Sequence, residues 1–111
     1  MEAKSRQTDI KMTARKLRRV INEVRGKAVV DAQTMLRFMP YFAAKVVEKN
    51  LNAAVANAKE KYGVSAEDLK VSEIYADESK TFRRGKPRAK GSIYKRLMRT
   101  SHLTVKVSDG K

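Results

Sequence analysis

The densest positive charge of the chain lies between residues 82 and 99, in the stretch FRRGKPRAKGSIYKRLMR. Eight of these eighteen positions are Lys or Arg, and none is Asp or Glu. Both side chains suit phosphate oxygens by charge, and the planar Arg guanidinium can also grip two oxygens or stack on a base. Phe82, Ile93 and Tyr94 are interleaved with the charges, where they could stack on unpaired bases or wedge into RNA. The stretch therefore predicts contact with a polyanion.

A second basic segment lies at the start of the chain. Residues 1–27 hold nine Lys or Arg against three acids, whereas residues 28–81 hold seven against eight. The formal net charge of the 111 residues is +14, and a compact domain gains no stability from that self-repulsion. Nucleic acid is the first candidate partner and an anionic membrane surface the second.

Catalytic and metal chemistry find little support. The chain has no Cys, which excludes a disulfide framework and a cysteine nucleophile, and its one His, His102, excludes a His cluster for zinc. The acidic pairs at 67–68 and 77–78 are adjacent in sequence, so on a strand their members would point to opposite faces. No apolar run approaches the roughly 18 residues that span a bilayer. We therefore expect no enzyme activity, no cofactor, no metal and no membrane anchoring.

Helical patterns position the N-terminal charges. Thr13 suits an N-cap, Leu17, Val20, Ile21 and Val24 follow at helical spacing, and the pair at 25–26 ends the segment with Gly. The basic residues lie mostly off this apolar stripe, so the helix has one apolar face and one broad basic face: Arg15, Lys16, Arg18, Arg19 and Arg25. Two more helices are predicted, from Val29 to Met39 and from Tyr41 to Tyr62, separated by Pro40.

Strand patterns flank the basic stretch. A weakly alternating polar strand is predicted within residues 2–12. Leu69 and Val71 alternate, but residues 74 and 76 continue on the opposite parity, which predicts a bulge near Ser72 and Glu73. Leu103, Val105 and Val107 alternate after the basic stretch. The simplest assembly is a single α+β domain of residues 1–111. Three helices pack on one face of a small sheet, and a long β-hairpin projects at about residues 80–100.

Several segments together resemble a known family. They are KMTARKLRRVINEVRGK (11–27), LRFMPYFAAK (36–45), NAAVANA (52–58), PRAKG (87–91) and RTSHLTVKV (99–107). In this order they are similar to the universal large-subunit ribosomal protein L twenty-two family, in its bacterial or plastid form. The resemblance implies three helices on a three-stranded antiparallel sheet, a hairpin that lines the polypeptide exit tunnel, and a role in assembly of the large subunit.

The resemblance and the basic pattern together assign the site residues. Those expected to bind rRNA are Lys11, Arg15, Lys16, Arg18, Arg19, Arg25, Lys27, Arg83, Arg84, Lys86, Arg88, Lys90, Lys95, Arg96, Arg99 and His102. The hairpin tip that would line the tunnel comprises Lys86, Pro87, Arg88, Ala89, Lys90, Gly91, Ser92, Ile93 and Tyr94. The implied partners are large-subunit rRNA, neighbouring ribosomal proteins and the nascent polypeptide, with no homo-oligomer.

Alternatives of other classes remain open at this point. A free basic RNA chaperone or an architectural nucleic-acid-binding protein would bind promiscuously, away from any particle. A peripheral membrane protein would use the first helix on anionic lipid, although that helix has no Trp or Phe to anchor it. The expected location is the ribosome. Bacterial cytoplasm and plastid stroma are both compatible, because a processed plastid chain would lack its transit segment.

Overall fold

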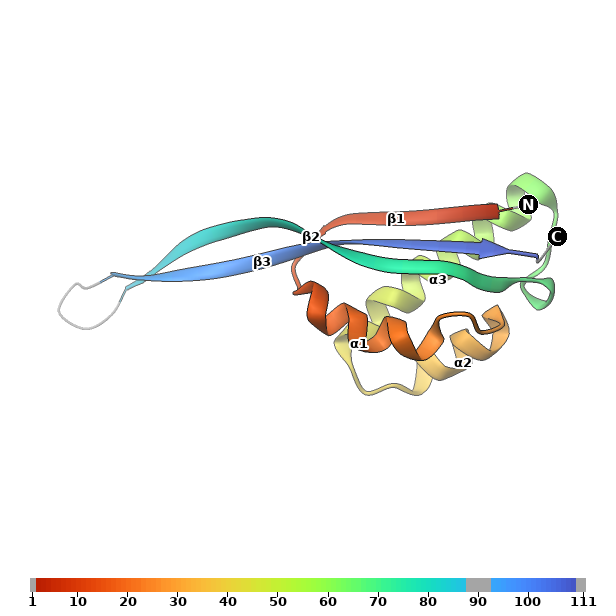
Figure 1. The fold of residues 1–111 in the computed structure, drawn as a ribbon, viewed down its shortest axis with the longest axis horizontal. Coiled ribbons are helices and arrows are strands. Elements are labelled where there is room, and N and C mark those ends of the chain that lie inside the picture. Colours follow the sequence, from red (N-terminus) through yellow and green to blue (C-terminus); the bar gives the residue numbers. More distant parts are fainter. Residues whose placement is uncertain (1, 88–92, 110–111) are drawn as a thin grey trace.

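The computed structural model describes residues 2–87 and 93–109, with the backbone alone for 80–87 and 93–98. The predicted α+β class is confirmed: the helices cover one face of a three-stranded antiparallel sheet with strand order β1-β3-β2 (Figure 1). The elements are β1 (Glu2–Ile10), α1 (Ala14–Val24), α2 (Val29–Phe38), α3 (Phe42–Tyr62), a short 3-10 helix (Ala66–Asp68), β2 (Lys70–Pro87) and β3 (Ile93–Ser108).

The helix ends follow the local signals in the sequence. Thr13 is the N-cap of α1, and its hydroxyl accepts a hydrogen bond from the backbone N–H of Lys16 at 3.4 Å. Gly63 ends α3 in the left-handed conformation that glycine adopts without strain. The predicted α2 and α3 were each one residue too long at the junction around Pro40. Met39 is extended because proline disfavours a helical conformation in the residue before it, and Tyr41, the N-cap of α3, is extended as well.

One apolar core lies between the helices and the sheet. The apolar stripe predicted for α1 is buried, and α3 buries several alanines that allow it to approach β1 and β3 closely. The largest fully buried side chains are Leu17, Ile21, Leu36, Leu51, Leu103, Val20, Val24, Val29, Val47, Val71, Val105 and Val107. No aromatic side chain among those that the structure describes belongs to this core.

The hairpin formed by β2 and β3 extends well beyond the body (Figure 1). The Cα radius of gyration is 17.0 Å, whereas a compact domain of this length has about 13 Å. β1 pairs with β3 only as far as Ser101, but the β2–β3 ladder continues to Pro87 opposite Ile93. Most of the basic stretch is therefore a two-stranded ribbon, and residues 88–92 lie outside the described part.

Bulges shape the sheet at both ends of the body. The bulge predicted near Ser72 is confirmed, because the register shifts between Val71 and Glu73. Two further shifts, at Gln7/Ile10 in β1 and Glu78/Thr81 in β2, flank β3 where the ribbon leaves the body. A bulge bends its strand and increases the local twist. The pair at the ribbon's root therefore sets the direction in which the hairpin projects.

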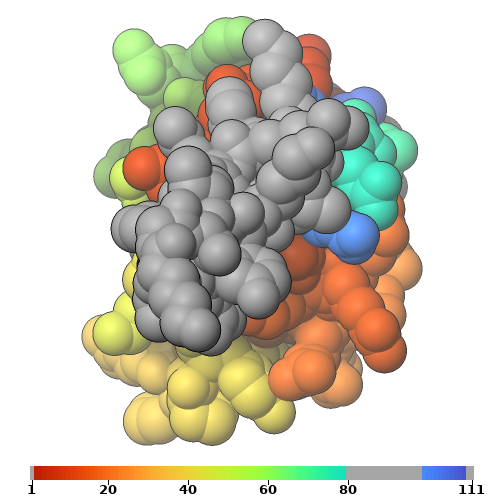
Figure 2. Space-filling model, turned by 90° about the vertical axis from the view of Figure 1, so that its left-hand side faces the viewer, coloured from red at the N-terminus to blue at the C-terminus, as the bar shows by residue number. Residues whose placement is uncertain are grey.

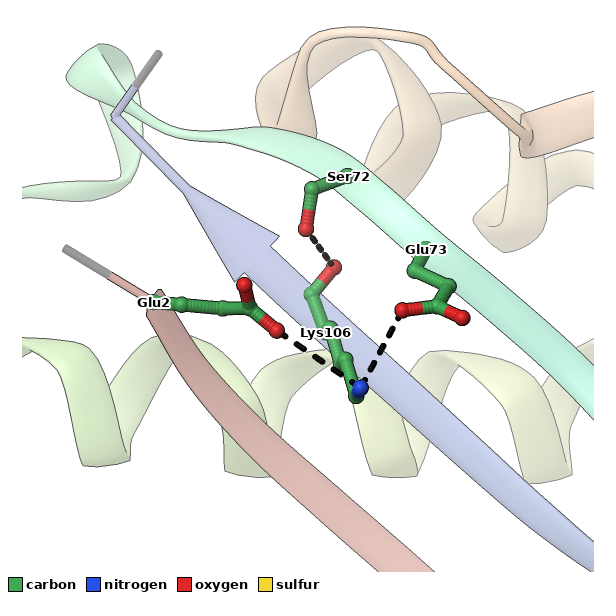
Figure 3. A network of polar contacts seen from close by, with 4 residues as sticks. All are labelled: Glu2, Ser72, Glu73 and Lys106. Atoms are coloured by element: carbon green, nitrogen blue, oxygen red, sulfur yellow. Dashed lines mark hydrogen bonds and ion pairs between the residues drawn. The ribbon is translucent and has the colours of Figure 1, made fainter. Parts of the chain in front are cut away.

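A charged cluster on the sheet spans all three strands (Figure 3). The Lys106 ammonium on central β3 lies 3.1 Å from a Glu73 carboxylate oxygen on β2 and 3.8 Å from one of Glu2 on β1. The hydrogen bond and charge of Glu73 raise the pKa of Lys106 above its usual value of 10.5. The Ser72 hydroxyl donates to the Lys106 carbonyl at 3.1 Å. These contacts join the three strands beside the first bulge.

The outer edge of β2 is covered by α1 and by the segment after it. The backbone N–H of Val29 donates to the Leu69 carbonyl at 3.0 Å, and the Val71 N–H donates to the Lys27 carbonyl at 2.9 Å. Farther along, Arg25 donates to the Ile74 carbonyl at 3.0 Å. An uncovered edge strand would offer free backbone groups to another chain. This covering protects the body's part of β2.

Candidate nucleic-acid interface

Helix α1 carries its basic residues in two rows on either side of its buried stripe. Arg15, Arg18 and Arg25 face β2 and the root of the hairpin, whereas Lys16 and Arg19 face the connection between α2 and α3. All five side chains are exposed. The broad basic face predicted from the sequence is thus divided between two neighbouring surfaces.

The row facing the sheet also has a structural role. A terminal guanidinium nitrogen of Arg18 donates to the Ala76 carbonyl at 2.9 Å. A terminal nitrogen of Arg25 donates to the carbonyl of Ile74, two residues away along the strand, at 3.0 Å. These bonds satisfy edge carbonyls of β2 and hold α1 against it. Each guanidinium carries five N–H donors, so donors remain for a phosphate. Two residues expected to bind rRNA therefore also hold the fold together.

An arginine-lined hollow lies at the root of the hairpin. Its volume is about 310 Å³. It brings Arg15 and Arg18 of α1 beside Arg99 of β3, which is 84 positions from Arg15 in the sequence. Its full lining is Thr13, Ala14, Arg15, Arg18, Glu78, Ser79, Arg99 and Thr100. With three guanidinium groups and one carboxylate, the hollow suits a phosphate group of a nucleic-acid backbone.

His102 lies at the same root of the hairpin, on β3 between the bulge at Gln7/Ile10 in β1 and the bulge at Glu78/Thr81 in β2. Its Nδ1 accepts a hydrogen bond from the Asp9 N–H at 3.2 Å, which places the proton of a neutral imidazole on Nε2. The Ser79 hydroxyl donates to an Asp9 carboxylate oxygen at 3.1 Å, and Asp9 has a positive φ of 53°. The side chain that was expected to bind rRNA is half-buried and locks β1 onto the hairpin base.

Ser101 and Thr100 are structural residues that sequence reasoning did not single out. Ser101 is fully buried, and its hydroxyl donates to the Met12 carbonyl at 2.7 Å. This bond ties the β1–α1 connection to β3, so it fixes the start of α1 relative to Arg99. Thr100 is also buried. The signal in the sequence was the position of both residues beside His102 in the segment 99–102, and polarity alone does not tell a buried hydroxyl from an exposed one.

The hairpin carries the remaining predicted residues as a basic ladder. Arg84 lies opposite Arg96 in the register, and Gly85 lies opposite Lys95. Like charges at opposed positions destabilise an antiparallel pair. Arg83, Lys86, Pro87, Ile93 and Tyr94 also lie in this ladder, whereas Arg88, Ala89, Lys90, Gly91 and Ser92 fall outside the described residues. A ribbon of this composition favours an external anion along its length.

Lys11 and Lys27 complete the predicted set. Lys11 is exposed between β1 and α1, and Lys27 is exposed after α1, with its backbone carbonyl engaged by β2. Within residues 2–87 and 93–109, no three His, Cys, Asp or Glu side chains gather closely enough to hold a metal ion. No helix in that part of the chain is long and apolar enough to cross a membrane.

Comparison with known protein families agrees with this arrangement. Residues 5–108 match the family model of ribosomal protein L22p/L17e. The match runs from β1 through the hairpin to the end of β3, so it includes the whole basic surface and the elements that position it. The chain therefore belongs to the ribosomal protein L22p/L17e family and is a protein of the large ribosomal subunit.

Proposed function

We propose that the protein is a non-catalytic constituent of the large subunit that binds rRNA through α1 and the hairpin. Its partners are large-subunit rRNA and neighbouring ribosomal proteins, and binding supports subunit assembly. The hairpin lines the polypeptide exit tunnel, where its tip meets the nascent chain. No homo-oligomer takes part.

The observation that carries the proposal is the continuity of the basic surface at the root of the hairpin. Arg15 and Arg18 lie beside Arg99, and Arg99 continues directly into the ladder in which Arg84 opposes Arg96. The ribbon is two-stranded beyond Ser101, because β1 pairs with β3 only as far as that residue. An isolated two-stranded ribbon is marginally stable in water. Phosphates on both sides would offset the repulsion and order the ribbon.

Co-sedimentation tests the proposal directly. A tagged protein is followed through a sucrose gradient of cell lysate, in low salt and after a high-salt wash. We expect it to remain with the large subunit in both. Protein at the top of the gradient, or spread over all nucleic acid, would instead favour a free RNA-binding role.

Titration with isolated large-subunit rRNA at several salt concentrations measures the electrostatic contribution to binding. If about eight phosphates are neutralised, the slope of log affinity against log salt should be about −6 to −7. A slope near zero would contradict phosphate contact by the basic surface.

A further inference from the structure

We propose that the hollow between α1 and the α2–α3 connection binds one unpaired rRNA nucleotide. The base would lie on the aromatic side chains of Tyr41 and Phe42, and its phosphate would lie against Lys16 and Arg19. This inference rests on the proposed function, because it assumes that rRNA reaches α1. It adds a site for a base, whereas the surfaces described above suit the phosphate backbone.

Three aromatic side chains around the α2–α3 connection lie on the surface, against the usual preference of such groups for the interior. Phe38 is 76% exposed, Phe42 69% and Tyr41 45%, all within five consecutive residues. Burying a large apolar side chain of this kind normally stabilises a fold. The core nevertheless consists of smaller aliphatic residues. Exposed aromatic groups that cluster in this way are typical of a surface that meets a partner.

The local fold holds Tyr41 and Phe42 in place. α2 ends at Phe38, Pro40 prevents a continuous helix, and Met39 packs against the core. The Tyr41 carbonyl accepts a hydrogen bond from the Ala44 N–H at 3.1 Å. Tyr41 occupies the N-cap position of α3 but makes no side-chain capping bond. Helix capping therefore does not account for an aromatic residue at this position.

The hollow combines an aromatic wall with positive charge. It measures about 330 Å³ and is lined by Met12, Lys16, Arg19, Pro40, Tyr41, Phe42 and Ala43. The Arg19 guanidinium carbon lies 5.5 Å from the centre of the Tyr41 ring, within cation–π range. None of the lining residues is acidic. In Figure 2, α1 (orange) and the connection (yellow) adjoin on the lower part of the face that looks along the hairpin.

The chemistry favours a nucleotide over a protein segment. An apolar side chain from a neighbouring protein would cover the rings but leave Lys16 and Arg19 poorly solvated beside it. A nucleotide presents a flat π-face and an anionic phosphate together. The π-face matches the aromatic side chains of the hollow, and the phosphate matches its two cations. Lys16 is adjacent to Arg15 on α1, so the base site and the arginine-lined hollow flank the same helix.

The test compares a double variant, Tyr41→Leu with Phe42→Leu, with the control Tyr62→Leu. Leucine keeps the apolar bulk but removes the π-face. Tyr62 is also exposed, at 50%, and lies at the other end of α3, about 30 Å away by helical rise. We expect the double variant to lose about 5- to 100-fold in affinity for isolated large-subunit rRNA, with the salt slope unchanged. The control should stay within about twofold of the wild type.

Chemical probing of the rRNA supplies a second readout. Wild type and Tyr62→Leu should protect an unpaired nucleotide that the double variant leaves reactive, and circular dichroism should show the variants equally folded. If the folded double variant binds and protects rRNA as the wild type does, the inference is overturned. The inference is also overturned if reconstituted subunits that contain the double variant lack only a neighbouring ribosomal protein, with rRNA binding unchanged. If the wild type itself fails to bind rRNA, the proposed function fails first.

Discussion

The two halves of β3 show two different ways of holding one strand. From Ser101 to Ser108 it is the central strand, with β1 and β2 on either side and the helices packed on one face. From Ile93 to Arg99 it pairs with β2 alone, in a segment dense in Lys and Arg. The first half is stabilised by the protein's own core. The second half lacks β1 as a neighbour, and its like charges at opposed positions favour a partner that neutralises them.

The largest effect should come from opening the core under the first half. Leu103→Ala removes a fully buried side chain from the middle of the sheet and should lower the free energy of unfolding by about 2–5 kcal/mol. Arg84→Ala, in the ribbon, is the matched control and should change it by less than about 0.5 kcal/mol. Urea unfolding of both variants measures the difference. Similar losses in both would mean that the ribbon shares the body's stability.

Shortening the ribbon should separate binding from folding. Replacing residues 85–95 with Asn-Gly leaves Arg84 and Arg96 flanking a two-residue hairpin turn. Unfolding should stay cooperative, with a free energy of unfolding within about 1 kcal/mol of the wild type, because every residue of the body's buried core cluster is kept. Four basic residues are lost, so the steepness of the salt dependence of rRNA binding should fall by up to about 3. Collapse of the body after this change would contradict the division into two regions.

The arginine-lined hollow at the junction of the two regions should contribute to rRNA binding but not to stability. Arg15→Gln combined with Arg99→Gln removes two cations from the arginine-lined hollow while leaving the edge bonds of Arg18 and Arg25 in place. We expect about a tenfold loss of rRNA affinity and a salt slope shallower by roughly 1.5. Lys61→Gln, on the last turn of α3, is the control. An unchanged affinity in filter-binding titrations would show that no phosphate occupies the hollow.

The smallest effect should come from the charged cluster on the sheet. Because the pKa of Lys106 is raised in the fold by Glu73, its stabilising contribution is complete below the unfolded pKa. It is lost as pH rises through the higher folded pKa, above 10.5. Wild-type protein should therefore lose slightly more stability between pH 9 and pH 11.5 than Lys106→Met. Equal pH profiles in urea unfolding would indicate that the cluster contributes nothing to the body.

Much of the body could be predicted from local patterns. The spacing of Leu17, Val20, Ile21 and Val24 identified α1, Thr13 its start, and the parity change after Val71 the first bulge. These features depend on neighbours a few residues apart. The polar strand β1 was harder to recognise from its own sequence, because it is held in part by hydrogen bonds from side chains of α3, far away in the chain. Asn50 donates to the Gln7 side chain at 2.7 Å, and Asn57 donates to the Lys4 carbonyl at 2.9 Å.

The candidate interface was predicted in composition but not in arrangement. The sequence alone determined that positive charge would be concentrated on one helix and on one stretch between two strands, because charge and periodicity are local properties. Only the tertiary structure decided that Arg15 meets Arg99, that Arg18 and Arg25 serve the edge of β2, and that Arg19 faces Tyr41. Those pairings join residues far apart in the chain. They depend on the sheet register and on how α1 packs, which long-range burial of the core determines.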